Sequence, residues 1–248
     1  MQRFFVPAEA IRAGVVDFDV GVAHQLRQVL RLGVGDIVVV GNGQGRVWQA
    51  ELIAVDRHGA RARLLAEQVT HSEPVTRITL YQGALKADKF EWVLQKGTEL
   101  GVYRFVPLIT QRSIVRDEAA LAGKRPRWQS IVREAAEQAG RAHVPEVAAA
   151  QHLSAALDAP AEAGSLRLMG WENATHPRLR AILEPTAGRG TTTAIDLFIG
   201  PEGGFANDEI AAAQARAVRV VSLGPRILRA ETAGLAAVVA VLYACHAM

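Results

Sequence analysis

Cysteine is almost absent from this sequence, and its scarcity narrows the classes of protein to which the chain can belong. Cys245 is the only cysteine among 248 residues, which excludes an internal disulfide and a cysteine-based zinc cage. The seven histidines are scattered, with no H-E-x-x-H and no ligand-like spacing, so we expect no metal site. No apolar run reaches the roughly 18–20 residues of a membrane span, and MQRFFVPAEA at the N-terminus lacks the blocks of a secretory signal. We therefore expect a cytoplasmic protein with neither a membrane nor a metal as its partner.

The motifs of several common enzyme classes are missing as well. No G-x-G-x-x-G follows the first expected strand and no G-x-x-x-x-G-K-[ST] occurs, which argues against a dinucleotide fold and a P-loop. No G-x-S-x-G elbow is present for a serine nucleophile. The formal net charge is +3, and arginine far outnumbers lysine in the chain. Arginine suits planar contacts to phosphates and bases. A genome rich in G and C would produce the same arginine excess, so composition alone leaves nucleic-acid binding open.

The N-terminal part of the chain has the pattern of a small β-barrel. Apolar runs on either side of the glycine-rich turn at residues 41–45 predict a hairpin, DIVVVGNGQGRVWQAELIAV. ARARLLAE predicts a further strand, and HQLRQVLRL predicts a short helix over residues 24–32. Short strands joined by glycine turns are typical of small barrels. The polar segment at residues 70–74 ends in proline and is a candidate linker.

From about residue 76 onward, strands alternate with helices. Strands are expected in RITLYQGAL, VYRFVPLIT, LRLMG, AIDLFIG and VRVVSLG. Helices are expected in DKFEWVLQKGTELG, RWQSIVREAAEQAG, residues 207–217 and the closing segment ETAGLAAVVAVLYACHA. This alternation indicates an α/β domain with a parallel sheet covered on both faces. The expected organisation is therefore two domains, at residues 1–72 and 73–248.

Three of the expected strands end in glycine, at Gly170, Gly200 and Gly224. In an open parallel sheet, ligands bind outside the carboxyl ends of the strands. The last two glycines lead into the segments PEGG and PRILRAET, and glycine lets a ligand approach the backbone closely. A flat, largely uncharged group such as adenine could lie between such loops and bond to main-chain groups. The alternative is that the glycines only form tight turns between strand and helix.

These two loops also carry a resemblance to a known family. LFIGPEGGFANDEI followed by LGPRILRAETAGLAAV resembles the C-terminal signature of SPOUT-class methyltransferases, and specifically of the bacterial 16S rRNA (uracil-N3)-methyltransferase family. KADKFEWVLQKGTELGV, VPLITQRS, REAAEQAGRAHVPEV and, in the N-terminal part, AHQLRQVLRLGVGD are similar to further family blocks. The resemblance implies a C-terminal SPOUT-type α/β domain with a deep trefoil knot, a feature too rare for composition to indicate. It also implies that the N-terminal barrel is a PUA-like RNA-binding domain.

The resemblance implies that S-adenosylmethionine binds in a bent form at the knot. The first glycine loop would form one wall of the pocket and the second loop the other, with the end of a preceding strand nearby. The implied cofactor-binding residues are Met169, Gly170, Gly200, Pro201, Glu202, Gly203, Gly204, Leu223, Gly224, Ile227 and Leu228.

The implied target is N3 of a specific uridine in 16S rRNA of the small ribosomal subunit. N3 lies on the Watson–Crick edge and carries a proton, so the base must be unpaired and must lose this proton. Negative charge then spreads onto the uracil carbonyls, where a guanidinium stabilises it. Arg229 is the main catalytic candidate and Arg226 the second. Glu231 or Glu202 could accept the proton or orient an arginine, and Glu231 would equally favour a helix N-terminus.

Arginines are also the candidate RNA contacts, although each could be an ordinary solvated charge. The expected helix at residues 24–32 places two of them four residues apart on one face. The candidates are Arg3, Arg27, Arg31, Arg112 and Arg141. The chain departs from the family pattern at Gln111, where glutamate is usual, and at Ala142, where asparagine is common. We therefore assign neither of these two positions a catalytic role.

The closing helix predicts a homodimer. Leu235, Val238, Val239 and Leu242 form an apolar stripe, and small residues cover much of the remaining surface. A helix that is apolar nearly all round is buried on more than one side, and the resemblance implies that the second side packs on another subunit. Two other functions stay open: methylation of another atom, such as a ribose 2′-oxygen, and non-catalytic RNA binding in ribosome assembly. The intact glycine loops argue against the second.

Overall fold

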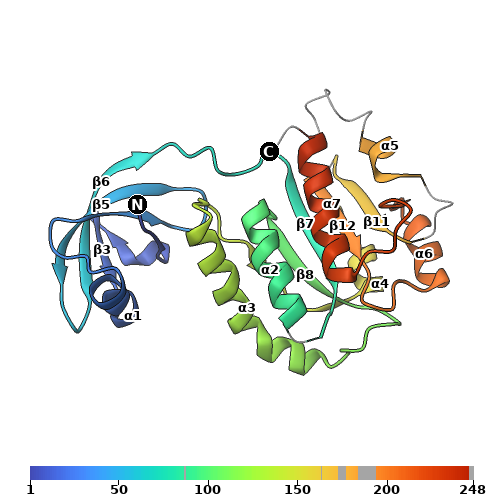
Figure 1. Cartoon of the computed structure of the whole chain (residues 1–248), viewed down its shortest axis with the longest axis horizontal. Coiled ribbons are helices and arrows are strands. Elements are labelled where there is room, and N and C mark those ends of the chain that lie inside the picture. The colour runs from blue at the N-terminus through green and yellow to red at the C-terminus, as the bar shows by residue number, and fades with distance from the viewer. Residues whose placement is uncertain (87, 163, 173–176, 184–193, 246–248) are drawn as a thin grey trace. The chain divides into compact units, whose positions relative to one another are not determined.

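The computed structural model describes residues 1–86, 88–162, 164–172, 177–183 and 194–245. The chain divides into two compact units (Figure 1). The first contains Met1–Glu73 and Ala136–Val144, and the second contains Pro74–Ala135 and Pro145–Met248. The sequence predicted a single boundary after residue 72. It did not predict that the chain returns to the first unit at Ala136–Val144.

The first unit is built on a six-stranded sheet with the order β1-β4-β5-β6-β3-β2. Its strands are β1 (Arg3–Phe5), β2 (Ile11–Arg12), β3 (Val15–Phe18), β4 (Ile37–Gly41), β5 (Val47–Val55) and β6 (Ala60–Gln68). Side chains from both edges of the sheet, Phe4 of β1 and Ile11 of β2, pack into one core. A sheet whose two edges share a core must curl around it, as the expected barrel requires.

The predicted hairpin is confirmed. β4 and β5 pair in antiparallel register from Ile37 opposite Glu51 to Gly41 opposite Val47. Asn42 shapes the turn, because its side-chain oxygen accepts hydrogen bonds from the backbone N–H groups of Gln44 and Arg46. The further strand expected from ARARLLAE is β6, which pairs with β5.

The helix expected over residues 24–32 is wrong in its bounds. Helix α1 (Val20–His24) begins after Asp19, whose carboxylate caps the Val22 N–H at 2.9 Å. A π-helical turn, Gln25–Val29, follows it. Arg31 has a φ of 57°, which ends the helical path before that residue. Arg27 and Arg31 therefore do not share one helix face.

Residues 136–144 complete the core of the first unit. The Gly45 N–H donates to the Ala142 carbonyl oxygen, and the Val144 N–H donates to that of Gly43. Ala142 is fully buried against Val39 and Val47. The position that departs from the family pattern is therefore a packing position within this unit, where a small apolar side chain fills the space.

The second unit is built on a parallel sheet with the order β10-β8-β7-β12-β11-β13, and β9 pairs with β8. Its strands are β7 (Arg77–Gly83), β8 (Arg104–Ile109), β9 (Glu146–Val147), β10 (Gln151–His152), β11 (Leu166–Gly170), β12 (Ala194–Ile199) and β13 (Arg219–Val221). All five strands expected from the sequence are present. β12 lies between β7 and β11 although it follows β11 in the chain, which brings the ends of β11, β12 and β13 together.

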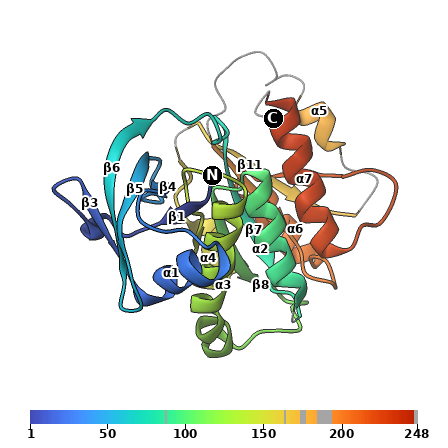
Figure 2. The same cartoon turned by 60° about the vertical axis from the view of Figure 1, so that its left-hand side comes forward.

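Helices cover both faces of this sheet, as expected from the alternation (Figures 1 and 2). They are α2 (Asp88–Leu100), α3 (Glu118–Gln138), α4 (Leu153–Asp158), α5 (Leu179–Leu183), α6 (Asn207–Gln214) and α7 (Ala230–Ala244). On one face, Leu80 of β7 lies against Gly234 of α7, and α2 packs beside α7. On the other face, Met169 and Phe198 share a core with Leu157 of α4 and Ile210 of α6.

Two helix bounds differ from those expected. α3 begins at Glu118, ahead of the expected start near residue 127, and continues through Pro126. The missing proline N–H leaves the Ala122 carbonyl without its helical donor, and both residues lie on the exposed side of the helix, where water can compensate. α6 ends at Gln214, before the expected residue 217, because Ala217 has a φ of 58°.

Candidate active site

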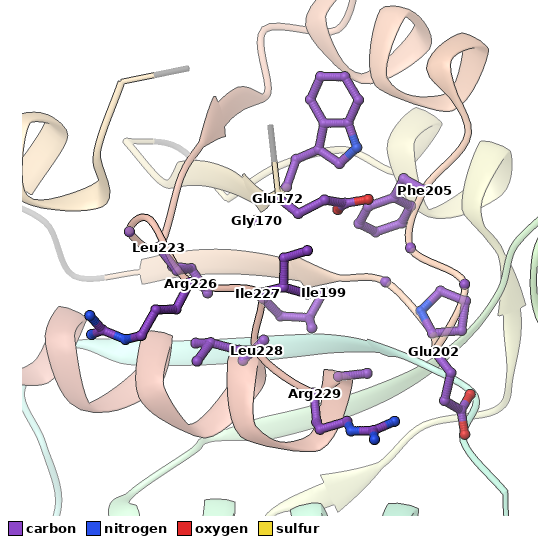
Figure 3. Close-up of a pocket in the computed structure, with 18 residues that line it drawn as sticks. Gly170, Glu172, Ile199, Glu202, Phe205, Leu223, Arg226, Ile227, Leu228 and Arg229 are labelled. Carbon is purple, nitrogen blue, oxygen red and sulfur yellow. The ribbon is translucent and has the colours of Figure 1, made fainter. Parts of the chain in front are cut away.

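A cavity of about 360 Å³ lies where β11, β12 and β13 end in the second unit (Figure 3). Parallel pairing sets Gly170 opposite Ile199 on one side and opposite Val221 on the other. The segments that follow these strands therefore start at one edge of the sheet. Among the sequence-predicted site residues, those that line the cavity are Gly170, Gly200, Pro201, Glu202, Gly203, Gly204, Leu223, Gly224, Arg226, Ile227, Leu228 and Arg229.

A tight turn forms the first wall. The Gly204 N–H donates to the Pro201 carbonyl oxygen at 2.9 Å, so Glu202 and Gly203 occupy the centre of the turn. Gly204 has a φ of 66°, and a Cβ there would lie 2.9 Å from the Glu172 carboxylate. A glycine is required at this position both by the backbone conformation and by the close approach of Glu172.

Two residues outside the predicted set hold this turn in place. Gly83 ends β7, and a Cβ there would lie 2.3 Å from the Pro201 nitrogen. The buried Gln82 donates from Nε2 to the Gly200 carbonyl oxygen at 3.3 Å. With Gly83 at its end, β7 is a fourth strand of this sheet that is closed by a glycine. The glycine in YQGAL could therefore have identified Gly83 as a residue of the site.

Arg112, expected as an RNA contact, also anchors the turn. Its Nη1 donates to the Gly203 carbonyl oxygen at 3.0 Å. The neighbouring Gln111 donates from its backbone to Glu209 at 2.9 Å and from its side chain to Asp208, both in the first turn of α6. The hydrogen bond from Gln111 is the largest influence on the pKa of the Asp208 carboxyl and holds it below its ordinary value. Gln111, which departs from the family pattern, thus helps to hold the first turn of α6 in place.

The second wall is the segment between β13 and α7. Gly224 has a φ of 124°, and Arg229 is the residue directly before α7. The side chains of Arg226 and Arg229 extend toward opposite ends of the cavity (Figure 3). Within the described part of the chain, neither guanidinium has a hydrogen-bond or ion-pair partner. Two unpaired cations at one cavity favour a ligand that carries negative charge or carbonyl oxygens.

Two residues of the predicted site lie elsewhere. Met169 is completely buried and its side chain packs in the core beneath the α4–α6 face of the sheet, because neighbouring strand residues alternate between faces. Glu231, expected as a catalytic carboxylate, lines a separate groove with Trp92 and Arg127. There its Oε1 lies 3.3 Å from Lys89 Nζ. Glu231 is not among the residues that line the cavity with Arg226 and Arg229.

Several residues that line the cavity were not predicted from the sequence. Their shared feature is that they flank the predicted loops, either at a strand end or at the start of the next segment. They are Trp171, Glu172, Ile199, Phe205, Ala230 and Ala233. Glu172 could have been predicted, because it is a charged residue two positions after Gly170, which was already expected at the site.

The arginines of the first unit have different environments. Arg27 and Arg31 both line a shallow depression. Arg3 donates to the Arg141 carbonyl oxygen, and burial lowers the pKa of its guanidinium despite the charge of Glu73. Arg141 is only 2% exposed and is ion-paired with Glu73. The expectation that Arg141 contacts RNA is therefore wrong, because its guanidinium is enclosed and already paired.

Comparison with known proteins identifies the family. A family model described as an RNA methyltransferase domain matches residues 71–242, and one described as an RNA methyltransferase PUA domain matches residues 22–65. The chain is 37% identical to ribosomal RNA small subunit methyltransferase E of Synechocystis sp. over 93% of its length and 74% of that protein. The chain belongs to the ribosomal RNA small subunit methyltransferase E family. The Mycobacterium tuberculosis member is 33% identical over 92% of this chain and 85% of its own.

Two solved structures of similar proteins have the same fold. The Neisseria gonorrhoeae enzyme, bound to S-adenosyl methionine, superposes with a TM-score of 0.86 at 34% identity, covering 98% of this chain and 97% of its own. A putative methyltransferase from Legionella pneumophila in complex with the cofactor SAM gives a TM-score of 0.86 at 29% identity, with 98% of each chain covered. The first unit of this chain is therefore PUA-like, and the cavity lies in its methyltransferase domain.

Among the helices in the described ranges, none combines the length and the apolar character that a membrane crossing needs. The described residues contain no group of three or more His, Cys, Asp or Glu side chains placed to hold a metal ion.

Proposed function

We propose that this chain uses S-adenosylmethionine to methylate N3 of a specific uridine in 16S rRNA of the small ribosomal subunit, in the cytoplasm. The observation that carries the proposal is the single cavity that joins both glycine loops to Arg226 and Arg229. It is supported by membership of the methyltransferase E family and by a 34% identical member with S-adenosyl methionine bound.

The cavity residues fit this cofactor. A volume of about 360 Å³ falls in the roughly 300–1,000 Å³ range of small-molecule sites. Ile199, Phe205 and Leu228 give the walls apolar surface for an adenine, while the glycines expose backbone groups for its polar edge. When bound, the sulfonium group supplies an activated methyl group. The residues proposed to hold it are Gly170, Gly200, Pro201, Glu202, Gly203, Gly204, Leu223, Gly224, Ile227 and Leu228.

We further propose that the loops around this cavity form the deep trefoil knot implied by the SPOUT resemblance. The order β7-β12-β11-β13 supports this proposal, since the chain reaches β12 only after β11 and then inserts it between β7 and β11. The segments after β12 and β13 face each other across one cavity, as two crossing loops of a knot would.

The chain's own residues have three tasks in this reaction: they hold the uracil, stabilise its developing charge and remove the N3 proton. Arg229 is proposed to donate to a uracil carbonyl oxygen, and Arg226 to a second oxygen or a phosphate. Both guanidiniums are free for these contacts among the described residues. In the first unit, Arg27 and Arg31 are proposed to bind phosphates, which would orient the RNA without reading its sequence.

A homodimer is part of the proposal. Leu235, Val238 and Leu242 are buried within the chain, whereas the opposite side of α7 is exposed. That exposed side is mostly small or apolar: Thr232, Ala236, Val239, Ala240 and Tyr243. An apolar helix face of this kind suits a self-complementary contact with a second copy of α7.

Nucleoside analysis tests the proposed function. Small subunits from a strain without the gene are incubated with the protein and S-adenosylmethionine, and the rRNA nucleosides are identified by mass spectrometry. We expect 3-methyluridine at one position. A 2′-O-methylated nucleoside would instead support the alternative target atom. Calorimetry without detectable cofactor binding would support a non-catalytic RNA-binding role.

A further inference from the structure

We infer that Glu202 is the residue that accepts the N3 proton of the target uracil. This inference rests on the proposed function and goes one step further, because the sequence left the proton acceptor open between Glu202 and Glu231. The turn at residues 201–204 fixes the position of Glu202. It is held by Gln82 at Gly200 and by Arg112 at Gly203.

The carboxylate of Glu202 is poorly satisfied by its own chain. Its Oε2 is buried, and no described group donates a hydrogen bond to it. Its Oε1 accepts only from the Lys86 backbone N–H, at 3.4 Å. Buried carboxylate oxygens nearly always have a donor, and Glu202 lines the cavity. If the carboxyl group turns so that Oε2 faces the cavity, a ligand N–H supplies the missing donor, and uracil N3–H is such a group.

The other two carboxylates near the cavity are placed differently. Glu231 also has a buried Oε2 without a donor among the described residues, but its Oε1 faces Lys89 in a separate groove. The Glu231 carboxylate is therefore already paired with a cation outside the cavity. Glu172 is exposed, and in Figure 3 it lies across the cavity from Arg229.

Glu202 and Arg229 extend toward the same end of the cavity, away from Arg226 (Figure 3). A uracil at that end would place N3–H toward Glu202 and a flanking carbonyl toward Arg229. This pairing matches the chemistry, because the base loses a proton at N3 while negative charge moves onto its oxygens.

The step balances in atoms and electrons. The N3 lone pair forms the bond to the methyl carbon, and the carbon–sulfur bond breaks with its electron pair retained by sulfur. The N3 proton passes to Glu202 Oε2, which leaves neutral 3-methyluridine and a neutral thioether. N3 becomes more acidic as the new bond forms, so a carboxylate is sufficient to take the proton during transfer.

The test compares Glu202→Gln with Glu231→Gln in the full chain. Each variant is assayed on the natural rRNA and on rRNA with 5-fluorouridine at the target, whose N3 proton is more acidic. We expect Glu202→Gln to lower kcat by about 100-fold or more at neutral pH. Its rate should recover as pH rises, and several-fold on the fluorinated RNA, because the proton then leaves without a base. Cofactor affinity is measured first by calorimetry, so that each variant is assayed at a saturating concentration of S-adenosylmethionine and kcat reports the transfer step.

Three outcomes would overturn the inference while the parent still makes 3-methyluridine. They are a near-parental rate for Glu202→Gln, a loss that is equal on both RNAs and at every pH, or the same rescue pattern in Glu231→Gln instead. A parent protein that makes no 3-methyluridine on either RNA overturns the proposed function itself. The two failures are therefore distinguishable.

Discussion

Arg141 and Glu73 lie 68 residues apart in the sequence, and Arg141 Nη2 is 2.6 Å from Glu73 Oε2. The same carboxylate accepts the backbone N–H groups of Ala142 and His143 at 2.8 and 3.2 Å. Glu73 stands in the segment expected as a linker, yet it fastens residues 136–144 to the first unit. Burial opposes its ionisation, but these donors outweigh burial, so the pKa of Glu73 lies below its ordinary value.

We expect Glu73→Gln to destabilise the full chain by about 2–3 kcal/mol at neutral pH, because it leaves the enclosed Arg141 cation unpaired. A carboxyl with a depressed pKa contributes stability above its unfolded pKa, and this contribution is lost as pH falls through the folded pKa. The variant and the parent should therefore converge in acid. Urea unfolding at several pH values measures the difference, and an equal difference at all pH values would contradict the ion-pair account.

Gly83→Ala should displace the turn at Gly200–Pro201, because a Cβ would lie 2.3 Å from the Pro201 nitrogen and 2.7 Å from the Gly200 carbonyl carbon. Both atoms belong to one backbone peptide bond, which cannot adjust cheaply, so we expect cofactor affinity to fall by more than about tenfold. Gly123→Ala in α3 is the matched control, since a Cβ there meets nothing within 4 Å. Calorimetry should show parental affinity for that control. Parental affinity for Gly83→Ala would show that the turn does not depend on this contact.

Arg229→Ala should leave the fold and cofactor affinity largely intact while it lowers the methyl-transfer rate at least roughly 100-fold, as the loss of a preorganised donor does. Arg226→Ala should have a smaller effect on the rate, because its side chain extends toward the other end of the cavity. Single-turnover kinetics with the natural rRNA separates the two. Near-normal turnover of Arg229→Ala would remove that residue from the mechanism.

The double variant Arg27→Ala, Arg31→Ala should bind rRNA more weakly and with less dependence on salt. Loss of two phosphate contacts reduces the slope of log affinity against log salt by about two. Cofactor affinity should not change, because both arginines belong to the first unit. Filter binding across a salt series provides the measurement. An unchanged slope would place the phosphate contacts on another surface.

Val239→Arg should convert a dimer to a monomer with its fold intact, because Val239 is 37% exposed and an arginine there would place charge in the proposed subunit contact. Leu242→Arg is the contrasting variant. Leu242 is fully buried, so that change should unfold the protein. Sedimentation and circular dichroism distinguish the two results. A parent protein that sediments as an active monomer at micromolar concentration would contradict the dimer.

Periodicity located the elements well wherever one face of an element is buried. The strands of the second unit and α2 follow from it, because Phe90, Val93 and Leu94 recur at helical spacing and are all buried. The failures occurred where a local effect decides a helix end. Asp19 caps α1 ahead of the helix start that the apolar pattern predicted. Arg31 adopts a left-handed conformation, which an arginine in the sequence does not predict.

The site was predictable to the extent that it is local in the sequence. The loops after β12 and β13 were recognised from their own residues, and most of their members line the cavity. Contacts between distant segments were not recognisable. Gln82 supports Gly200 from 118 residues away, and only the strand order puts β7 beside β12. The same reasoning explains Arg141, whose sequence context gives no sign of its burial against Glu73.

The return of residues 136–144 to the first unit has a consequence for biosynthesis. An N-terminal domain that was continuous could fold as soon as it left the ribosome, whereas this one lacks Ala142 in its core and the Arg141 partner of Glu73 until much later. At a translation rate of about 5–20 residues per second, the 68 residues between these partners take roughly 3–14 seconds to appear. During that interval the nascent barrel is open beside Val39 and Val47, so its completion waits for the middle of the methyltransferase domain to be synthesised.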